Sequence, residues 1–142
     1  MVTMQVQIET KGPIFEGKAP AIIERGVHNA IQQLVEMGEQ RLDLMLRPRP
    51  AGVYLSVAEA RKGQASTGNY RRNVHGMVTH LHGLITDGGV IYGPWLEGIS
   101  SRNDTTRFKG YGSFRRVGQS LQKDATGVLE KHISKAVAEL NA

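Results

Sequence analysis

The chain has 142 residues, 39% hydrophobic and 22% charged, a balance that is typical of one soluble globular domain and excludes a disordered tail. It contains no cysteine, so disulfides, thiolate zinc sites and cysteine nucleophiles are excluded together. We expect neither a signal peptide nor a membrane-spanning helix, because no basic segment precedes an apolar one at the N-terminus and no apolar run approaches about 18 residues.

The net charge of +5 is distributed unevenly along the chain. Residues 47–116 hold 11 Lys and Arg against 4 Asp and Glu, giving +7, and the rest of the chain holds 7 against 9, giving −2. A basic middle region favours a polyanion or an acidic protein as a partner. A solvated surface that binds nothing explains the same pattern equally well, so both interpretations stay open.

Hydrophobic periodicity predicts a strand and then a long helix in the first third of the chain. Apolar and polar residues alternate over residues 2–9, which is the period of a half-buried strand. From Pro20 to about Arg47, apolar residues recur at three- and four-residue steps and predict one amphipathic helix, which Pro48 and Pro50 end. Such a helix is about 40 Å long, so we expect one end to project or to contact something outside the protomer.

The middle of the chain is predicted to contain short extended segments. Residues 52–57 favour a strand or an extended edge, and residues 58–63 favour a helical turn. Ser66 or Thr67 is expected to cap a short turn that follows. Residues 74–86 are interpreted as a single strand, in which two glycines mark a bulge or the close approach of another backbone.

The last part of the chain is predicted to be a hairpin, a polar loop and a second helix. Residues 87–89, Asp-Gly-Gly, have the composition of a hairpin turn, from which residues 90–92 return as a strand. Residues 100–112 are expected to be loop, and a helical period from Ser113 onward predicts an amphipathic helix that Ser113 caps. Residues 1–142 therefore form a single α+β domain, with a mostly antiparallel sheet packed against both helices and a long basic loop.

No constellation of side chains in the sequence predicts catalysis. His80 and His82 lie on one face of the predicted strand, but a metal site needs further ligands that the neighbouring sequence does not supply. The motifs of a nucleophile elbow, a zinc protease and a Walker loop are absent from the sequence. We therefore expect no enzyme, no metal and no cofactor, and a small enzyme that uses Glu97 and the strand histidines is a remote alternative.

Residues 92–100, Tyr-Gly-Pro-Trp-Leu-Glu-Gly-Ile-Ser, form the junction between the predicted sheet and the basic loop. Trp95 is the only tryptophan in the chain, and a ring of that size is costly to leave in water. It is therefore expected to anchor either the fold or a partner. Glu97 is expected to pair with an arginine of the following loop or of a neighbouring subunit.

Basic side chains in the predicted loops and at the start of the second helix are candidates for contact with nucleic acid. Because no recognition-helix or RNA-binding signature accompanies them, they would meet phosphates without reading the base sequence. A nonspecific DNA-binding module is therefore an alternative function. The DNA-facing candidates are Arg71, Arg72, Lys109, Arg115 and Arg116.

Three short motifs resemble those of the neck and minor tail-component proteins of long-tailed bacteriophages, a family that joins head and tail. Residues 66–73 (STGNYRRN) are similar to the family's D-T-G-x-L-R-x-S turn, residues 92–100 to its Y-A-x-x-V-E-F-G-T segment, and residues 106–116 (TRFKGYGSFRR) to the arginine-rich loop before its R-P-F-L-x-P-A. The resemblance covers about residues 20–142. An aspartate, an aromatic residue and a proline of the family pattern are missing, so the joining, completion and terminator positions all stay open.

The resemblance implies a structural virion protein of the phage neck or tail top, located in the virion after assembly in the host cytoplasm. It implies a homo-oligomeric ring, commonly sixfold, around the DNA channel, and each protomer of such a ring presents two different surfaces. The implied partners are further copies of the chain, neighbouring neck and tail-tube proteins and, without sequence preference, the packaged DNA, with no membrane partner. Candidate subunit-interface residues are Tyr92, Trp95, Glu97, Arg102, Arg107, Phe108 and Phe114.

Overall fold

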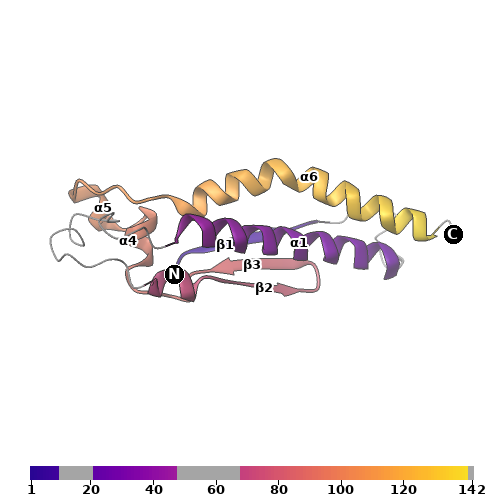
Figure 1. The fold of residues 1–142 in the computed structure, drawn as a ribbon, viewed down its shortest axis with the longest axis horizontal. Coiled ribbons are helices and arrows are strands. Elements are labelled where there is room, and N and C mark those ends of the chain that lie inside the picture. Colours follow the sequence, from indigo (N-terminus) through magenta and orange to yellow (C-terminus); the bar gives the residue numbers. More distant parts are fainter. Residues whose placement is uncertain (10–20, 48–67, 141–142) are drawn as a thin grey trace.

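A three-stranded antiparallel sheet and two long helices make up most of what the computed structural model describes, which is residues 1–9, 21–47 and 68–140 (Figure 1). Short helices connect these larger elements. The arrangement confirms the α+β class. The elements are β1 (Thr3–Gln7), α1 (Ala21–Met45), α3 (Asn69–Asn73), β2 (His75–Thr79), β3 (His82–Thr86), α4 (Gly93–Glu97), α5 (Ser101–Thr105) and α6 (Ser113–Leu140).

The sheet has the strand order β1-β3-β2, and its inner face lies against α1. Met4 of β1 and Gly76 of β2 both lie opposite Ile85 of β3. A Cβ atom on Gly76 would be 2.4 Å from Cγ1 of Val35 in α1, and one on Gly83 would be 2.6 Å from Cγ2 of the same residue. The two glycines therefore leave room for a side chain of α1, whereas the sequence predicted a bulge or the close approach of another backbone.

The single strand predicted over residues 74–86 is wrong, because the chain reverses at His80 and Leu81 to give β2 and β3. This turn contains no glycine or proline, and a contact from α1 helps to hold it. The ring Nδ1 of His28 donates to the backbone carbonyl of His80 at 2.6 Å. His80 therefore belongs to the turn, and it does not share a strand face with His82.

The hairpin expected at residues 87–89 is also wrong. These residues leave β3 and lead into α4, and residues 90–92 form no strand. The loop expected over residues 100–112 contains the short helix α5. Three further expectations lie outside the described residues: the strand at 52–57, the helical turn at 58–63 and the cap at Ser66 or Thr67.

The core lies between α1, the inner face of the sheet and α6, and both long helices were predicted. Each fully buried aliphatic side chain stabilises the fold by about 1.5–3 kcal/mol. Gly38 of α1 leaves room for side chains of the sheet and of α6, because a Cβ atom there would be 2.3 Å from Cδ1 of Ile85 and 3.0 Å from Cδ1 of Leu121. The buried apolar residues of the two helices are Ile23, Val27, Ala30, Ile31, Leu34, Val35, Leu42, Phe114, Val117, Leu121, Val128 and Ala136.

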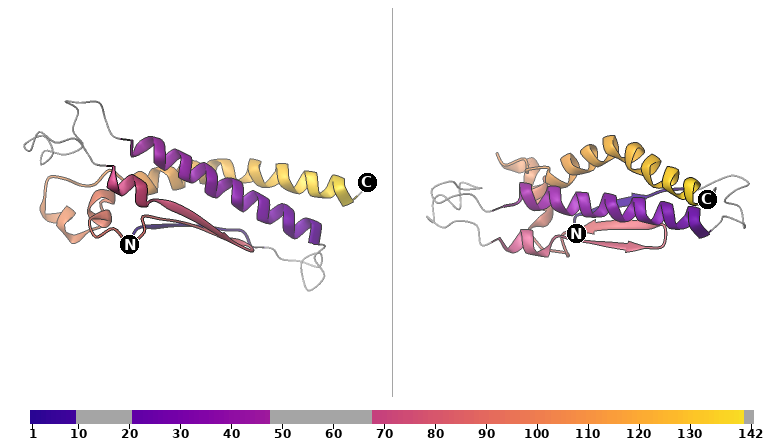
Figure 2. Two further views of the ribbon diagram at one scale, coloured as in Figure 1. Left: turned by 60° about the horizontal axis from the view of Figure 1, so that its bottom comes forward. Right: turned by 45° about the vertical axis from the view of Figure 1, so that its right-hand side comes forward.

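The two long helices run in opposite directions and define the long axis of the domain (Figure 1 and Figure 2). α1 lies over β3 and β2, whereas α6 packs beside α1 and contacts the sheet mainly at β1. The short helices α3, α4 and α5 gather with the last turn of α1 and the first turn of α6 at one end, which we call the junction end. Among the helices that the structure describes, none is long and apolar enough to cross a lipid bilayer.

Candidate assembly surface

Two backbone segments cross at the centre of the junction end, one after α4 and one before α6. The backbone N–H of Tyr111 donates to the carbonyl of Leu96 at 2.7 Å. Gly98 and Gly110 touch at the crossing, since a Cβ atom on Gly110 would be 2.2 Å from Cα of Gly98. Their φ angles are +103° and +89°, a conformation that side-chain-bearing residues rarely adopt. Both positions therefore require glycine.

The buried side chain of Asn103 joins three parts of the junction end. Its amide nitrogen donates to the carbonyls of Trp95 at 3.0 Å and Phe108 at 3.1 Å, and its amide oxygen accepts the backbone N–H of Ser100 at 3.0 Å. Nζ of Lys109 donates to the backbone carbonyl of Asn103 at 2.8 Å. Sequence reasoning missed Asn103, although its spacing from Ser100 is that of the helix-capping box that begins α5.

Three aromatic rings pack together in the junction end. The ring centroids of Trp95 and Phe108 are 4.6 Å apart, and those of Phe108 and Tyr111 are 4.9 Å apart with an edge-on angle of 66°. Tilted pairs at these distances are favourable beyond the area that they bury. All three rings are half-buried. Trp95 therefore anchors the fold of this end, which is one of the two roles expected of it.

The carboxylate of Glu97 caps the start of α6. Its Oε2 accepts the backbone N–H of Phe114 at 3.0 Å, and its Oε1 accepts that of Arg115 at 2.9 Å. The carboxylate pairs two N–H groups that a helix start leaves without partners, and it complements the positive end of the helix dipole. This contact differs from the expected pairing of Glu97 with an arginine side chain. It also gives Glu97 the capping role that was expected of Ser113.

A second carboxylate is buried beneath α4. Asp87 is fully buried, its Oδ1 accepts the backbone N–H of Gly89 at 3.0 Å, and its Oδ2 faces Gly93. A Cβ atom on Gly93 would lie 2.0 Å from that oxygen, so glycine makes room for it. Burial, followed by the negative charges of Asp87 and Glu97, raises the pKa of Tyr70 above its usual range.

Within the described ranges, no group of three His, Asp or Glu side chains is placed to hold a metal ion.

Large apolar side chains are exposed at the junction end. Ile91, just before α4, is 98% exposed, and Ile99, just after α4, is 67% exposed. Leu44 and Met45 end α1, and Met1 precedes β1 at the same end (Figure 1). Of the eight exposed large apolar residues in the described part of the chain, six therefore gather here. We call this group the apolar tip, and it consists of Met1, Leu44, Met45, Ile91, Tyr92 and Ile99.

Among the DNA-facing candidates, Arg71, Lys109 and Arg116 bind groups inside the domain. Arg71 forms a two-point ion pair with Asp43 of α1, with 2.7 Å between Nη2 and Oδ2, and its hydrogen bonds hold the pKa of that carboxyl below its usual range. Nζ of Lys109 donates to the backbone carbonyl of Asn103 in α5, and the guanidinium of Arg116 donates to the carbonyl of Tyr111 at 2.5 Å. Exposed basic side chains are found at Arg72, Arg102, Arg107 and Arg115.

Some of the candidate subunit-interface residues are exposed, and the others are buried or half-buried and hold the fold together. Phe114 is only 4% exposed and belongs to the core, so it is not available to a partner. Tyr92 is exposed, and its hydroxyl accepts a hydrogen bond from the amide of Asn69 at 2.6 Å. Trp95, Glu97 and Phe108 are half-buried and hold the loops together, whereas Arg102 and Arg107 are exposed.

The junction end thus combines an internally tied scaffold with exposed apolar and basic side chains. Such a surface suits binding to another macromolecule, because the polar groups beneath it are already committed to the fold. No protein-family model, no curated protein and no solved structure matches this chain.

Proposed function

We propose that the protein is a structural component of the neck or tail top of a long-tailed phage, and that it assembles head-to-tail into a ring around the DNA channel. The observation that carries this proposal is the apolar tip, in which Ile91 is almost completely exposed. Soluble monomers seldom gather large exposed apolar residues at one place unless another protein covers them. Assembly would cover them.

The scaffold beneath the apolar tip supports a role in assembly. The hydrogen bonds of Asn103 and Glu97 fix both ends of the segment that follows α4. Ile91 and Ile99 therefore project from either side of a short helix whose position is set. Binding then costs little conformational entropy, because the backbone that carries these side chains is already ordered.

The residues that resemble the phage family lie in the same part of the domain. Residues 92–100 include α4 and Gly98, and residues 106–116 include Gly110, which contacts Gly98 where the two segments cross. A ring of identical subunits places the tip of one protomer against a different surface of the next. The joining, completion and terminator positions remain alternatives within this proposal, and a sixfold ring is the commonest expectation for the family.

Exposed arginines favour one further candidate function, nonspecific contact with DNA phosphates. Arg102, Arg107 and Arg115 have exposed side chains at the junction end. Fewer basic side chains are available than the sequence suggested, because three candidates bind groups within the domain. We therefore expect weak binding with a shallow dependence on salt. Absence of binding to short duplex DNA at low salt would exclude this candidate.

Replacing both isoleucines of the apolar tip by serine tests the proposed assembly. Light scattering and co-sedimentation should detect wild-type rings, or wild-type protein bound to capsid or tail fractions. The Ile91→Ser/Ile99→Ser variant should unfold at the same urea concentration as the wild type, because both side chains are already in water, and it should remain monomeric. Met77→Ser is the matched control, since Met77 is 49% exposed on the outer face of the sheet, away from the tip.

The possible results distinguish an error in the proposed function from an error in the proposed contact surface. A wild-type protein that stays monomeric and never joins phage particles would refute the structural role. A double variant that assembles as well as the Met77→Ser control would show that another surface makes the contact.

A further inference from the structure

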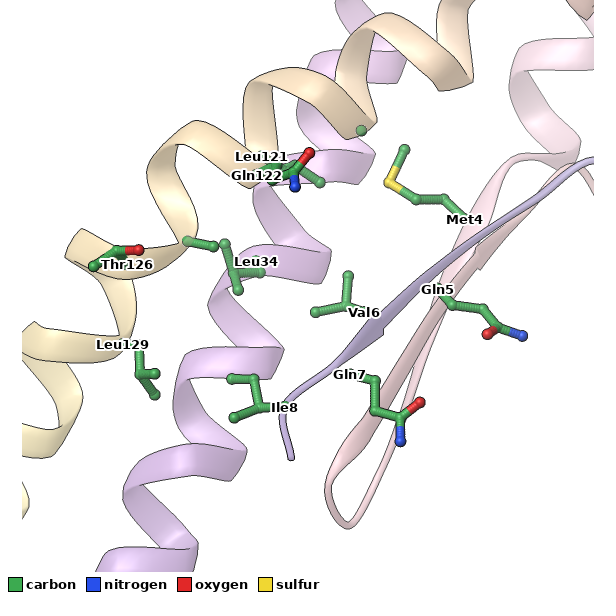
Figure 3. Close-up of a pocket in the computed structure, with 12 residues that line it drawn as sticks. Met4, Gln5, Val6, Gln7, Ile8, Leu34, Leu121, Gln122, Thr126 and Leu129 are labelled. Carbon is green, nitrogen blue, oxygen red and sulfur yellow. The ribbon is translucent and has the colours of Figure 1, made fainter. Parts of the chain in front are cut away.

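A groove of about 470 Å³ opens between β1 and α6 on the side of the sheet away from β2 (Figure 3). Its floor is apolar and is formed by Val6 of β1, Ile8 just after β1, Leu34 of α1, and Leu121 and Leu129 of α6. Alternate side chains of β1 point toward the two helices, and the intervening glutamines point away from them. The volume corresponds to roughly 15 water molecules, so the groove can admit several side chains together.

Over the described residues, the sheet has one strand fewer than the two long helices could cover. In the part of the chain that the structure describes, β1 pairs with β3 on one side only, so alternate N–H and C=O groups along its other side face the groove. Helices packed side by side are about 8–10 Å apart and strands about 4.8 Å apart, so two helices cover about four strands. α1 covers β3 and β2, whereas α6 contacts β1 and lines the groove beside it, which is where a fourth strand would lie.

We propose that this place is filled by residues 53–57 of a second copy of the chain, which would add a strand to β1. The inference rests on the head-to-tail ring of the proposed function. Residues 53–57 read Val-Tyr-Leu-Ser-Val, so three apolar side chains alternate with two others, as an inserted strand with one buried face requires. The sequence carries no charge from residue 50 to residue 58, and the rim of the groove is also uncharged. The rim residues are Gln5, Gln7, Gln122 and Thr126.

The attachment of this segment favours donation to a neighbour. Residues 48–67 lie outside the described residues, and they connect Arg47 at the end of α1 with Gly68 at the start of α3. α3 leads directly into β2, which is the edge of the sheet opposite to β1. Within one protomer, the segment to be donated is thus attached near the β2 edge of the sheet, and β1, which would accept a strand from a neighbour, is the opposite edge. Repeating the same donation from copy to copy gives a heterologous interface, which closes into a ring when the rotation allows it.

Disulfide trapping in the 142-residue chain tests the proposal, because the sequence has no cysteine. Gln7→Cys and Ser56→Cys chains are purified separately, mixed at high concentration and oxidised. Residues opposite each other on paired strands have Cα atoms about 4.5–5.5 Å apart, which a disulfide can bridge. We expect a mixed dimer joined at these two cysteines, identified by the mass of the linked peptides. Gln5→Cys is run in parallel, since a register shift of two residues would favour it.

Thr79→Cys is the matched control for this experiment. Thr79 and Gln7 both lie opposite His82, so they share one row of the outer face, but Thr79 is on β2 at the other edge. A mixture of Thr79→Cys and Ser56→Cys chains should give no specific mixed dimer. Preferential cross-linking at Thr79 would place the donated strand on β2 and overturn the proposal. An intramolecular cross-link in a diluted Gln7→Cys/Ser56→Cys double variant would also overturn it, because the chain would then complete its own sheet.

A charge placed in the groove gives an independent readout. Ala125 is half-buried in the lining of the groove, and Ala138 is exposed farther along the same helix. In the Gln7→Cys background, Ala125→Glu should lower the yield of mixed dimer at least about tenfold, because an inserted apolar strand would bury the carboxylate. Ala138→Glu should leave the yield unchanged. Equal yields from the two variants, or no cross-link in any pairing, would overturn the proposal.

Failure of this inference is distinguishable from failure of the proposed function. Protein that joins phage particles without the Gln7–Ser56 cross-link would refute strand donation alone. Protein that forms the cross-link but never joins particles would refute the role in the virion and leave strand exchange between copies intact.

Discussion

The junction end buries polar side chains and exposes apolar ones, whereas the opposite end of the domain pairs polar side chains near its surface. At the junction end, the buried amide of Asn103 bonds to three backbone groups while Ile91 lies in water. Toward the opposite end, Arg25 and Glu139 form an exposed ion pair at 2.9 Å, and the ring of His132 meets the side-chain oxygen of Gln33 at 2.7 Å. Exposed ion pairs of this kind contribute about 0–1 kcal/mol each.

The difference indicates where the chain depends most on single side chains. Toward the opposite end, the long helices pack through a continuous apolar stripe, and each polar pair can be lost at little cost. The junction end has short helices of five residues, which do not hold themselves together in water. Single polar side chains must therefore fix its backbone. We expect substitutions of these polar side chains to affect stability more than substitutions of the surface pairs.

Asn103→Ala should have the largest effect among the changes that compare the two ends. It leaves the carbonyls of Trp95 and Phe108 and the N–H of Ser100 without their partner, and we expect a loss of about 3 kcal/mol in the free energy of unfolding. Urea denaturation measures this loss. Trp95, the only tryptophan, adds a local signal, since loosening of the junction end should change its fluorescence before the domain unfolds.

Asn29→Ala is the control for this prediction, because Asn29 is an exposed residue of α1 and should tolerate the change within about 0.5 kcal/mol. If Asn103→Ala destabilises the domain no more than Asn29→Ala does, the amide does not hold the junction end together.

Glu97→Ala should have an intermediate effect. It removes both acceptors at the start of α6, and loss of a helix cap costs about 1–2 kcal/mol. Glu97→Gln keeps one acceptor oxygen but no charge, so it should retain part of that stability. Thermal unfolding of the two variants, compared with Glu130→Ala on the exposed face of the same helix, checks the order. Equal stability of Glu97→Ala and Glu130→Ala would contradict the capping role.

The long elements of the fold could be predicted from the sequence because their signal is periodic. The first strand, α1 and α6 follow from alternation and from three- and four-residue steps, and each buries a continuous stripe. The turn between β2 and β3 was missed because His80 and Leu81 carry no turn chemistry and because a contact from His28 helps to fix it. Asp87-Gly88-Gly89 has turn chemistry, but in the fold it leads into α4.

The candidate site was predicted in part. The sequence located it at residues 92–116, because a lone tryptophan, glycines and arginines concentrate there. The roles of Glu97 and Asn103 could not be derived, since their partners lie up to 18 residues away and are backbone groups that any residue supplies. The internal partners of Arg71 and Lys109 were equally invisible, because a basic side chain that binds phosphate and one that binds its own domain have the same sequence signature.

The smallest expected effect concerns pH, at His132 in the half of the domain away from the junction end. Burial, followed by the positive charges of Lys131 and Lys135, lowers the pKa of His132 below its ordinary value of about 6.5. Below that pH the unfolded chain binds the proton more readily than the folded chain, so the associated stability is present above about pH 6.5 and is lost as the pH falls through the folded pKa.

His132→Gln removes this titration and keeps a polar group facing Gln33. The urea midpoint of the wild type should therefore fall more between about pH 7.5 and about pH 5 than that of His132→Gln. Asn29→Ala, which changes an exposed residue of α1 and removes no titratable group, should show the same fall as the wild type. An identical pH dependence in all three proteins would mean that protonation of His132 costs nothing. The opposite end would then accept a protonated His132 without loss of stability, and only the junction end would depend on single polar side chains.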